Sequence, residues 1–230
     1  MLDEAPIASP PLQAPISLLI ACIASLPVHK VQSFPELAVE KLTDILRLAI
    51  PAYAQPSWER ELMPLLLVLL RVAQSESHIA HSRLREYLLP TTQDRTVPLG
   101  QGDSLPHILL RLGATSMEPE LRELVLSLFF ELSNNDSSRF VSNVGFGNAA
   151  GFLASRGIQV SQDDLAEGEG TGGEPDFNPI TGQLRDLEPQ PNLPEMTTEE
   201  KEREAERLFV LFERFVLRSP FPFLANLDVG

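Results

Sequence analysis

Apolar residues recur at intervals of three and four along most of this chain, and this spacing constrains its fold more than any other feature. An α-helix places residues so spaced on one face, whereas strict alternation, typical of a half-buried strand, is not evident. The sequence therefore predicts amphipathic helices packed through their apolar faces. Three stripes are clearest: Leu37, Leu42, Ile45, Leu46 and Ala49; Leu62, Leu65, Leu66, Leu69, Leu70 and Ala73; and Leu121, Leu124, Val125, Leu128, Phe129 and Leu132.

Proline, glycine and capping residues suggest where these helices begin and end. We expect ends at Pro51, Pro90 and Gly113, and a break near Gly145. Many helices with short connections and broad apolar faces indicate an all-α fold, and they favour a stacked superhelix of the armadillo or HEAT kind. This architecture is inferred from the number and length of the helices, because no clean internal repeat is evident. The expected helices span 16–26, 35–49, 58–74, 78–89, 103–112, 118–134 and 137–156.

The composition changes after Gly157, and three regions follow from it. Residues 1–157 form the expected helical array, and residues 158–196, rich in glycine, proline and acids, are expected to be a mobile loop. Residues 197–230 begin with a C-terminal amphipathic helix. The acidic segment accounts for most of the net charge of −14.

Two hydroxyl residues in the acidic region are candidates for phosphorylation. Ser161 and Thr171 each stand three residues before an acid, Asp164 and Glu174, an arrangement that acid-directed kinases favour. Added phosphate would make an already negative loop more negative. A merely acidic linker is the alternative.

Charge and cysteine content exclude several classes of function. No dense run of Lys and Arg is present, so binding to nucleic acid is not expected. Cys22 is the only cysteine, which excludes an intrachain disulfide and a zinc site built on several thiolates. The apolar stretch 12–28 could be a signal peptide, but Asp3 and Glu4 stand where a positive flank is usual, so a buried helix is favoured. No segment is expected to span a membrane.

The stretch VGFGNAAGFLASRG places glycines at Gly145, Gly147 and Gly151, and glycine-rich turns before a helix often hold phosphate. The spacing is G-x-G-x-x-x-G, one residue longer than the dinucleotide-binding pattern, and the preceding residues indicate a helix, not a strand. We favour close packing, in which small residues let another helix approach. No cofactor is expected.

His78 and His81 stand three residues apart on an expected helix, close to Arg83 and Arg85. The histidines could share a metal, but no third ligand at a suitable spacing is evident, so no metal site is expected. The cluster could attract a carboxylate or an acidic peptide, or form a solvated helix face. No catalytic constellation is evident, so the function is expected to be binding, not covalent chemistry.

Three motifs in order then point to a known family. The segment RFVSNVGFGNAAGFLASRGI resembles the glycine-rich signature of the synembryn family, also called resistance to inhibitors of cholinesterase 8, with Phe146 in place of its tyrosine. NPITG resembles the family's N-P-V-T-G loop, and MTTEEKEREAERL resembles its acidic helix with one extra threonine. Upstream, YLLPTTQDR resembles a further family segment. The resemblance is to the C-terminal half of a family member, of the fungal type.

This resemblance implies a function. Synembryns are receptor-independent guanine nucleotide exchange factors and folding chaperones for heterotrimeric G-protein α subunits, in both the GDP-bound and the nucleotide-free state. The resemblance also implies a superhelix whose concave surface takes up the C-terminal helix of the α subunit. It further implies a cytoplasmic protein that is recruited to the plasma membrane through the G protein. A generic helical-repeat scaffold without exchange activity is the alternative.

The resemblance also suggests roles for individual residues. Arg83 and Arg85 lie in a segment that resembles a basic stretch facing the α-subunit tail. The C-terminal helix is expected to contact the partner or to pack back onto the array. Its expected contact residues are Leu208, Phe209, Phe212 and Phe215. The motif residues expected to position the array are Gly145, Gly147, Asn148, Gly151, Asn178, Pro179 and Gly182.

Overall fold

The structure is a computed structural model that describes residues 10–27, 35–53, 58–115, 118–158, 177–188 and 198–218. The chain divides into two compact units, residues 1–188 and residues 189–230. The helical array belongs to the first unit, and the C-terminal helix belongs to the second.

Eight α-helices and two short 3-10 helices make up the regular secondary structure in the described part of the first unit. The same part contains one isolated antiparallel bridge, between Phe177 and Leu184. The all-α class is therefore confirmed for the described residues. The helices are α1 (Ile16–Ser25), α2 (Glu36–Ala52), α3 (Trp58–Ala73), α4 (His78–Leu88), η3 (Asp94–Thr96), α5 (Leu105–Thr115), α6 (Pro119–Leu132), α7 (Ser137–Val144), α8 (Phe146–Ser155) and η4 (Arg185–Leu187).

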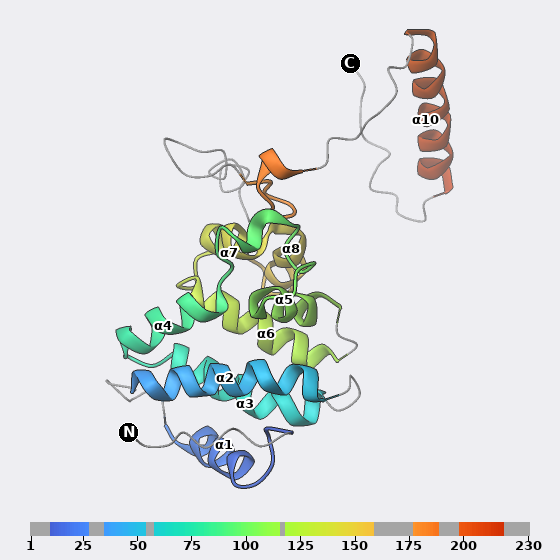
Figure 1. Cartoon of the computed structure of the whole chain (residues 1–230). Helices are drawn as coiled ribbons and strands as arrows, with labels where there is room; N and C mark the ends of the chain where they lie inside the picture. The colour runs from blue at the N-terminus through green and yellow to red at the C-terminus, as the bar shows by residue number, and fades with distance from the viewer. Residues whose placement is uncertain are drawn as a thin grey trace. The chain divides into compact units, whose positions relative to one another are not determined.

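Helix α6 lies at the centre of this unit. It packs against α3 on one side and α5 on another, and α3 in turn contacts α1 and α2. Figure 1 shows the helices following one another from α1 at one end of the unit to α7 and α8 at the other. Most residues of the predicted stripes lie in the core: Leu66 on α3 and Leu121 on α6 are fully buried, and Phe129 is 1% exposed. Leu37, which the first stripe also included, is 60% exposed.

Three phenylalanines join the last helices to this core. The rings of Phe130, Phe140 and Phe152 come from α6, α7 and α8, and their centroids lie 5.3 to 5.7 Å apart. Edge-on and tilted pairs at this distance add to the free energy gained from burial alone. The cluster therefore fixes α7 and α8 against α6.

The local sequence explains where several helices begin. Pro119 occupies the first turn of α6, where its missing N–H costs nothing. The Ser77 hydroxyl accepts from the backbone N–H of Ala80 at the start of α4, and the Asp136 carboxylate accepts from that of Arg139 at the start of α7. Each oxygen satisfies a donor that has no partner within the helix.

Two predicted helix ends are wrong, and two are confirmed. Helix α2 continues past Pro51 to Ala52, and α5 continues through Gly113 to Thr115. A Cβ at Gly113 would lie 3.2 Å from a methyl carbon of Leu126, so this glycine allows α5 to approach α6. Helix α4 ends before Pro90, and Gly145, with a φ of 79°, separates α7 from α8.

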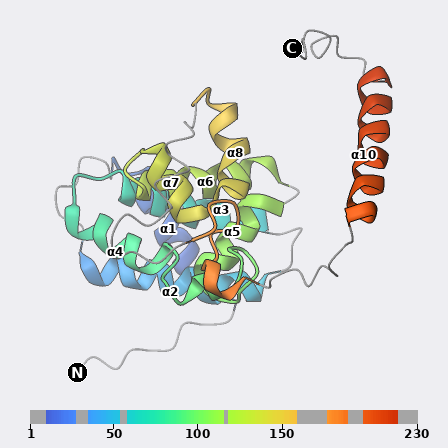
Figure 2. The same ribbon diagram turned by 90° about the horizontal axis from the view of Figure 1, so that it is seen from above.

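Residues 177–188 differ from the mobile loop that composition suggested for 158–196. They contain a turn, the Phe177–Leu184 bridge and η4, and they belong to the first unit. Backbone hydrogen bonds join them to α8 and to the segment around η3. In Figure 2 they are the orange ribbon beside α5 and α8. We call residues 177–188 the latch.

The described part of the second unit is α10 (Thr198–Arg218). It forms where the acidic helix of the third motif was expected. Leu208 is 59% exposed and Phe209 is 65% exposed, so these apolar side chains face solvent.

Candidate functional site

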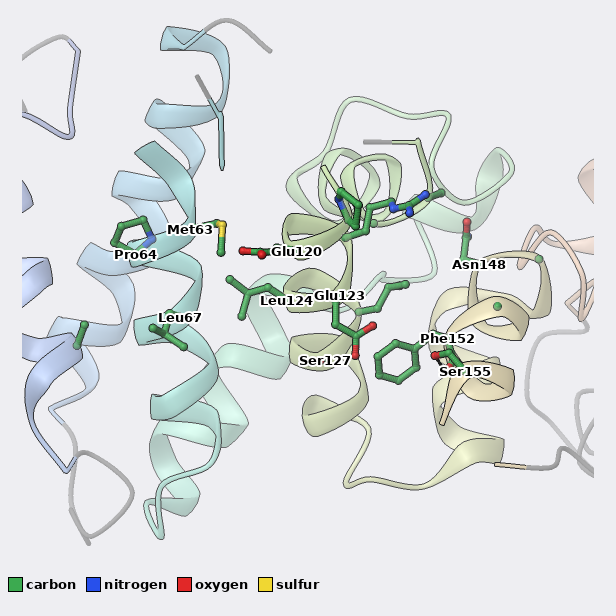
Figure 3. Close-up of a pocket in the computed structure, with 18 of the residues that line it drawn as sticks. Met63, Pro64, Leu67, Glu120, Glu123, Leu124, Ser127, Asn148, Phe152 and Ser155 are labelled. Carbon is green, nitrogen blue, oxygen red and sulfur yellow. Dashed lines mark hydrogen bonds between the residues drawn. The ribbon is translucent and has the colours of Figure 1, made fainter. Parts of the chain in front are cut away.

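A groove of about 1220 Å³ lies along α6, with α3 on one side and α8 on the other. Figure 3 shows this arrangement: Leu124 and Glu123 on the central helix, Met63 and Leu67 on α3, and Phe152 on α8. Small residues of α1 and α5 complete the edges.

Helix α3 contributes apolar side chains both to the core and to the groove. Leu62, Leu65 and Leu66 point into the core and are fully buried. Met63 and Leu67, one turn apart, line the groove instead. Helix α3 packs against α1, α2, α4 and α6, and these neighbours account for most of its apolar surface. The half-buried side chains of Met63 and Leu67 contribute to the lining of the groove.

A polar edge follows α6 towards α8. The Arg156 guanidinium donates to Oε1 of Glu123 at 2.7 Å and to Oγ of Ser127 at 2.9 Å. It also lies 4.2 Å from the centroid of the Phe152 ring. These contacts hold charged groups at the margin of the groove and leave its floor apolar.

Small residues keep the groove open on the α8 side. A Cβ at Gly151 would meet no atom within 4 Å, so among the described residues no helix packs against this glycine. The sequence interpretation of helix approach at these glycines is therefore wrong for Gly151. Gly147 does lie against other backbone, but that backbone is the carbonyl of Ile180 in the latch, and not a helix.

The two family motifs that the sequence singled out come together here. The backbone N–H of Phe146 donates to the carbonyl of Pro179 at 2.8 Å, and that of Gly147 donates to the carbonyl of Ile180 at 3.1 Å. The glycine-rich stretch and the NPITG turn thus form one structural unit, although about thirty residues separate them in the sequence. Asn148 lies next to this junction and lines the groove.

Arg83 and Arg85 lie on α4 and are not among the residues that line the groove. Arg83 forms ion pairs with Glu36 on α2 and, at 2.8 Å, with Glu86. The hydrogen bond to Glu86 and the charge of Glu36 raise the pKa of Arg83. Arg85 donates to the carbonyl of Leu132 at 2.5 Å. Both arginines therefore hold α4 against its neighbours.

Four other predicted site residues are outside the described side chains or segments. The side chains of Phe212 and Phe215 on α10 are not described, and Ser161 and Thr171 lie in a segment that is not described. Leu208 and Phe209 are described and exposed.

Within the described ranges, no group of three or more metal-binding side chains is present, and none of the helices is long and apolar enough to cross a bilayer. The groove combines a mainly apolar lining with charged side chains at its margin, as surfaces that bind an amphipathic helix do. The described residues thus form an all-helical unit with a groove lined mainly by apolar side chains of α3, α6 and α8.

Comparison with known proteins gives the family. The family model described as guanine nucleotide exchange factor synembryn matches residues 1–217. The chain therefore belongs to the synembryn family.

Named relatives include three vertebrate proteins called Chaperone Ric-8A. The Gallus gallus protein is 33% identical over 153 residues, which cover 61% of this chain and 28% of the relative. The Macaca fascicularis protein is 31% identical over 160 residues, covering 66% and 30%, and the Danio rerio protein is 31% identical over 153 residues, covering 61% and 28%. The matched region thus spans less than a third of each relative.

Sequence reasoning missed the residues that line the groove on α3 and α6. Met63 and Leu67 belong to the apolar stretch LMPLLLVLL, and because an apolar stretch also predicts a core helix, the pattern assigns them to no site. The signal that could have found them is the width of the apolar surface of α3, which exceeds one helix face.

Proposed function

We propose that this chain acts on heterotrimeric G-protein α subunits as a receptor-independent guanine nucleotide exchange factor and folding chaperone. In this proposal the chain corresponds to a C-terminal portion of such a protein. Family membership supports this proposal, and so does the chaperone name of the vertebrate relatives. The proposed arrangement of the helices is an armadillo/HEAT-like superhelix, and the groove along α6 lies on its concave surface.

The groove is the observation that supports the function most directly. We propose that it takes up the C-terminal helix of the α subunit, with apolar partner residues on Leu124, Met63 and Phe152 and polar ones at the margin formed by Glu123 and Arg156. An amphipathic helix would bury its apolar face there and keep its polar face in water. Its burial would supply the free energy of binding.

Exchange in this proposal involves no covalent chemistry and no cofactor of this chain. A protein that binds the nucleotide-free α subunit more tightly than the GDP-bound one shifts the equilibrium towards nucleotide release, and it need not contact GDP itself. The proposed location is the cytoplasm, with recruitment to the plasma membrane through the G protein. Neither nucleic acid nor a membrane-spanning segment has a part in it.

The exposed apolar residues of α10 supply a proposed second contact with the partner. Replacing Phe209 with Asp would place a charge on that face, and Phe209→Ala is the matched variant that removes the ring without adding charge. We expect the Asp variant to weaken association with the α subunit by about tenfold and to leave the circular dichroism of the chain unchanged, because a charge on an apolar contact costs more than a lost ring. Loss of helical content would contradict the assignment of Phe209 to a contact face.

A decisive experiment uses Gly151, which faces open space in the groove. Gly151→Phe would fill the groove, whereas Gly151→Ala adds one methyl group where no atom lies within 4 Å. We expect the parent chain and the Ala variant to retain nucleotide-free α subunit in a pull-down, and the Phe variant to lose it by about tenfold or more, since overfilling a binding surface forces the partner away.

The same samples distinguish exchange from plain scaffolding. GDP release from a purified α subunit is measured with the parent chain, with each Gly151 variant, and with a chain extended upstream. Faster release with the parent and extended chains supports the proposal. Equal binding to the GDP-bound and nucleotide-free forms would identify a scaffold without exchange activity and contradict it.

A further inference from the structure

The latch closes on itself through short-range hydrogen bonds. The backbone N–H of Gly182 donates to the carbonyl of Asn178 at 2.8 Å, and the N–H of Asn178 donates to the carbonyl of Gln183 at 2.8 Å. The side-chain oxygen of Asn178 accepts from the N–H of Ile180, also at 2.8 Å. An Asn side chain in this position stabilises a turn within its own segment. The latch therefore presents its carbonyls in a fixed arrangement.

Two of those carbonyls cap α8. The residue that precedes this helix, Gly145, has no side chain that could cap it. Instead, Pro179 and Ile180 accept the hydrogen bonds from Phe146 and Gly147, the first two residues of the helix. Amides in the first turn have no partner within a helix, so an external acceptor fixes the position of that turn.

The glycines before and within this turn allow the approach. A Cβ at Gly145 would lie 2.9 Å from the carbonyl oxygen of Ile180, and one at Gly147 would lie 3.2 Å from the same atom. Side chains at these positions would push the latch away. The glycine-rich stretch is thus shaped to receive a carbonyl of this chain, and not a phosphate.

Arg95 anchors the latch from the other side. Its side chain, which is 5% exposed, donates to the carbonyl of Gly182 at 3.0 Å and to that of Ser142 in α7 at 2.7 Å. The guanidinium also lies 4.3 Å from the centroid of the Phe177 ring, and the N–H of Leu184 donates to the Arg95 carbonyl at 2.8 Å. Burial lowers the pKa of Arg95 and the charge of Asp94 raises it, but an arginine remains protonated in proteins.

The first turn of α8 also forms a wall of the groove. Gly147 donates to the latch and lines the groove, and Asn148, the next residue, lines it as well. Figure 3 shows Asn148 and Phe152 on the same side of the groove, opposite Met63 and Leu67. A shift of this turn would therefore move a wall of the groove.

We propose that the latch positions the α8 wall of the groove, with Arg95 as its anchoring residue, and that the seating of the latch regulates partner binding there. The regulatory part rests on the proposed function; the positioning part does not. The consequence is that a segment within the acidic region 158–196 sets the shape of a groove formed by α3, α6 and α8.

The test is made on the full chain with Arg95→Met, which removes every donor of the anchor and retains an unbranched apolar side chain. Gly151→Cys in a Cys22→Ser background carries an environment-sensitive fluorophore in the groove. The emission spectrum of the fluorophore is recorded on this labelled chain. Amide hydrogen exchange at Phe146 and Gly147, and the affinity for a synthetic peptide that reproduces the last helix of a G-protein α subunit, are measured on unlabelled chains that retain Gly151, because a fluorophore in the groove would itself block the peptide.

We expect exchange at the two amides to rise by about tenfold or more, since charge-assisted hydrogen bonds are lost. The emission is expected to shift, and the peptide is expected to bind about tenfold more weakly. Exchange at Val125, in the core of α6, should stay within about twofold, because the core does not depend on this anchor. Arg95→Lys, which retains the charge but not the two-armed geometry, should give intermediate values.

Two further variants keep the result interpretable. Arg111→Met is the matched control, because Arg111 also donates to two backbone carbonyls, those of Gly100 and Gly102, which lie outside the latch. Asn178→Ala changes the turn of the latch without touching the anchor, and it replaces Arg95→Met if that variant does not fold. Both latch variants should give the spectral shift, and Arg111→Met should not.

The possible outcomes separate the positioning role of the latch from its regulatory role. Unchanged exchange at Phe146 and Gly147, or raised exchange without a spectral shift, would overturn the positioning role of the latch. A spectral shift with unchanged peptide affinity would overturn its regulatory role. Failure of the parent chain to bind the peptide would overturn the regulatory role and the assignment of the partner, while the fluorophore would still decide the positioning role.

Discussion

Helices α6 and α10 have similar sequence patterns and opposite environments. On α6, Leu121 and Val125 are fully buried and Phe129 is 1% exposed. On α10, Leu208 is 59% exposed and Phe209 is 65% exposed. Both segments place apolar residues at helical spacing, so the pattern that identifies the two helices does not distinguish them.

The difference between α6 and α10 shows that an apolar stripe predicts a helix with a face suited to burial. The stripe does not predict which neighbouring element, if any, buries that face. Neighbouring helices α3 and α5 cover α6. Helix α8 contains both situations within ten residues: the latch covers Gly147, and open groove faces Gly151. The expected effects of substitution follow this division.

The largest effect is expected where the stripe is covered. Phe129→Ala removes a ring that is 1% exposed and leaves a cavity in the core. We expect it to lower the free energy of unfolding by about 3–5 kcal/mol. Urea unfolding followed by circular dichroism measures this value, and a loss below about 1 kcal/mol would mean that Phe129 is not a core residue.

The next largest effect concerns the contact between α8 and the latch. Gly145→Ala would force a side chain into a backbone conformation with φ 79° and against the Ile180 carbonyl. We expect a loss of roughly 2–3 kcal/mol. Gly157→Ala is the matched control, because Gly157 also has a positive φ, 67°, but faces open space; its cost should be about 1 kcal/mol. Equal losses for the two variants would argue against the contact with the latch.

Substitution of a glycine that contacts no other segment should raise the free energy of unfolding instead of lowering it. Gly151 lies inside α8, and an added Cβ would meet nothing within 4 Å. Gly151→Ala should therefore raise the free energy of unfolding by about 0.5–1 kcal/mol through helix propensity alone. Thermal unfolding detects this as a higher Tm, and a lower Tm would indicate that Gly151 is packed against part of the chain.

The smallest effect is expected on α10. Phe209→Ala removes a ring as large as that of Phe129, from a position that is 65% exposed. The free energy of unfolding should change by no more than about 0.5 kcal/mol. Measured beside Phe129→Ala under identical conditions, this variant tests the comparison directly, and equal losses for the two phenylalanines would refute it.

Much of the fold could be predicted because its signals are local. Helix spacing placed α3 to within one residue of its observed span, and proline and capping residues placed α4 and α6 to within two. Helix α5 was misplaced at its end because Gly113, a common helix terminator, is there to let α5 approach Leu126. Nothing in the local sequence distinguishes these two uses of glycine.

The candidate site was predicted only in part, since it depends on contacts between distant segments. The sequence identified the glycine-rich stretch and the NPITG turn, but not that Gly147 donates to Ile180. It also assigned Arg95 no role, although this arginine ends the YLLPTTQDR segment, because the contacts that Arg95 makes are with residues far away in the sequence. Arg83 and Arg85 were conspicuous by charge, yet the structure pairs them with neighbouring helices.

Residues close together in the chain were enough to predict the all-helical class, the approximate spans of most helices and the family, because helical spacing and ordered motifs are local patterns. The tertiary structure alone decided which apolar faces became core and which became the groove, and it brought Arg95, Gly147 and Ile180 into one unit. Such choices depend on which surfaces remain once all helices have packed, and no local pattern contains that information.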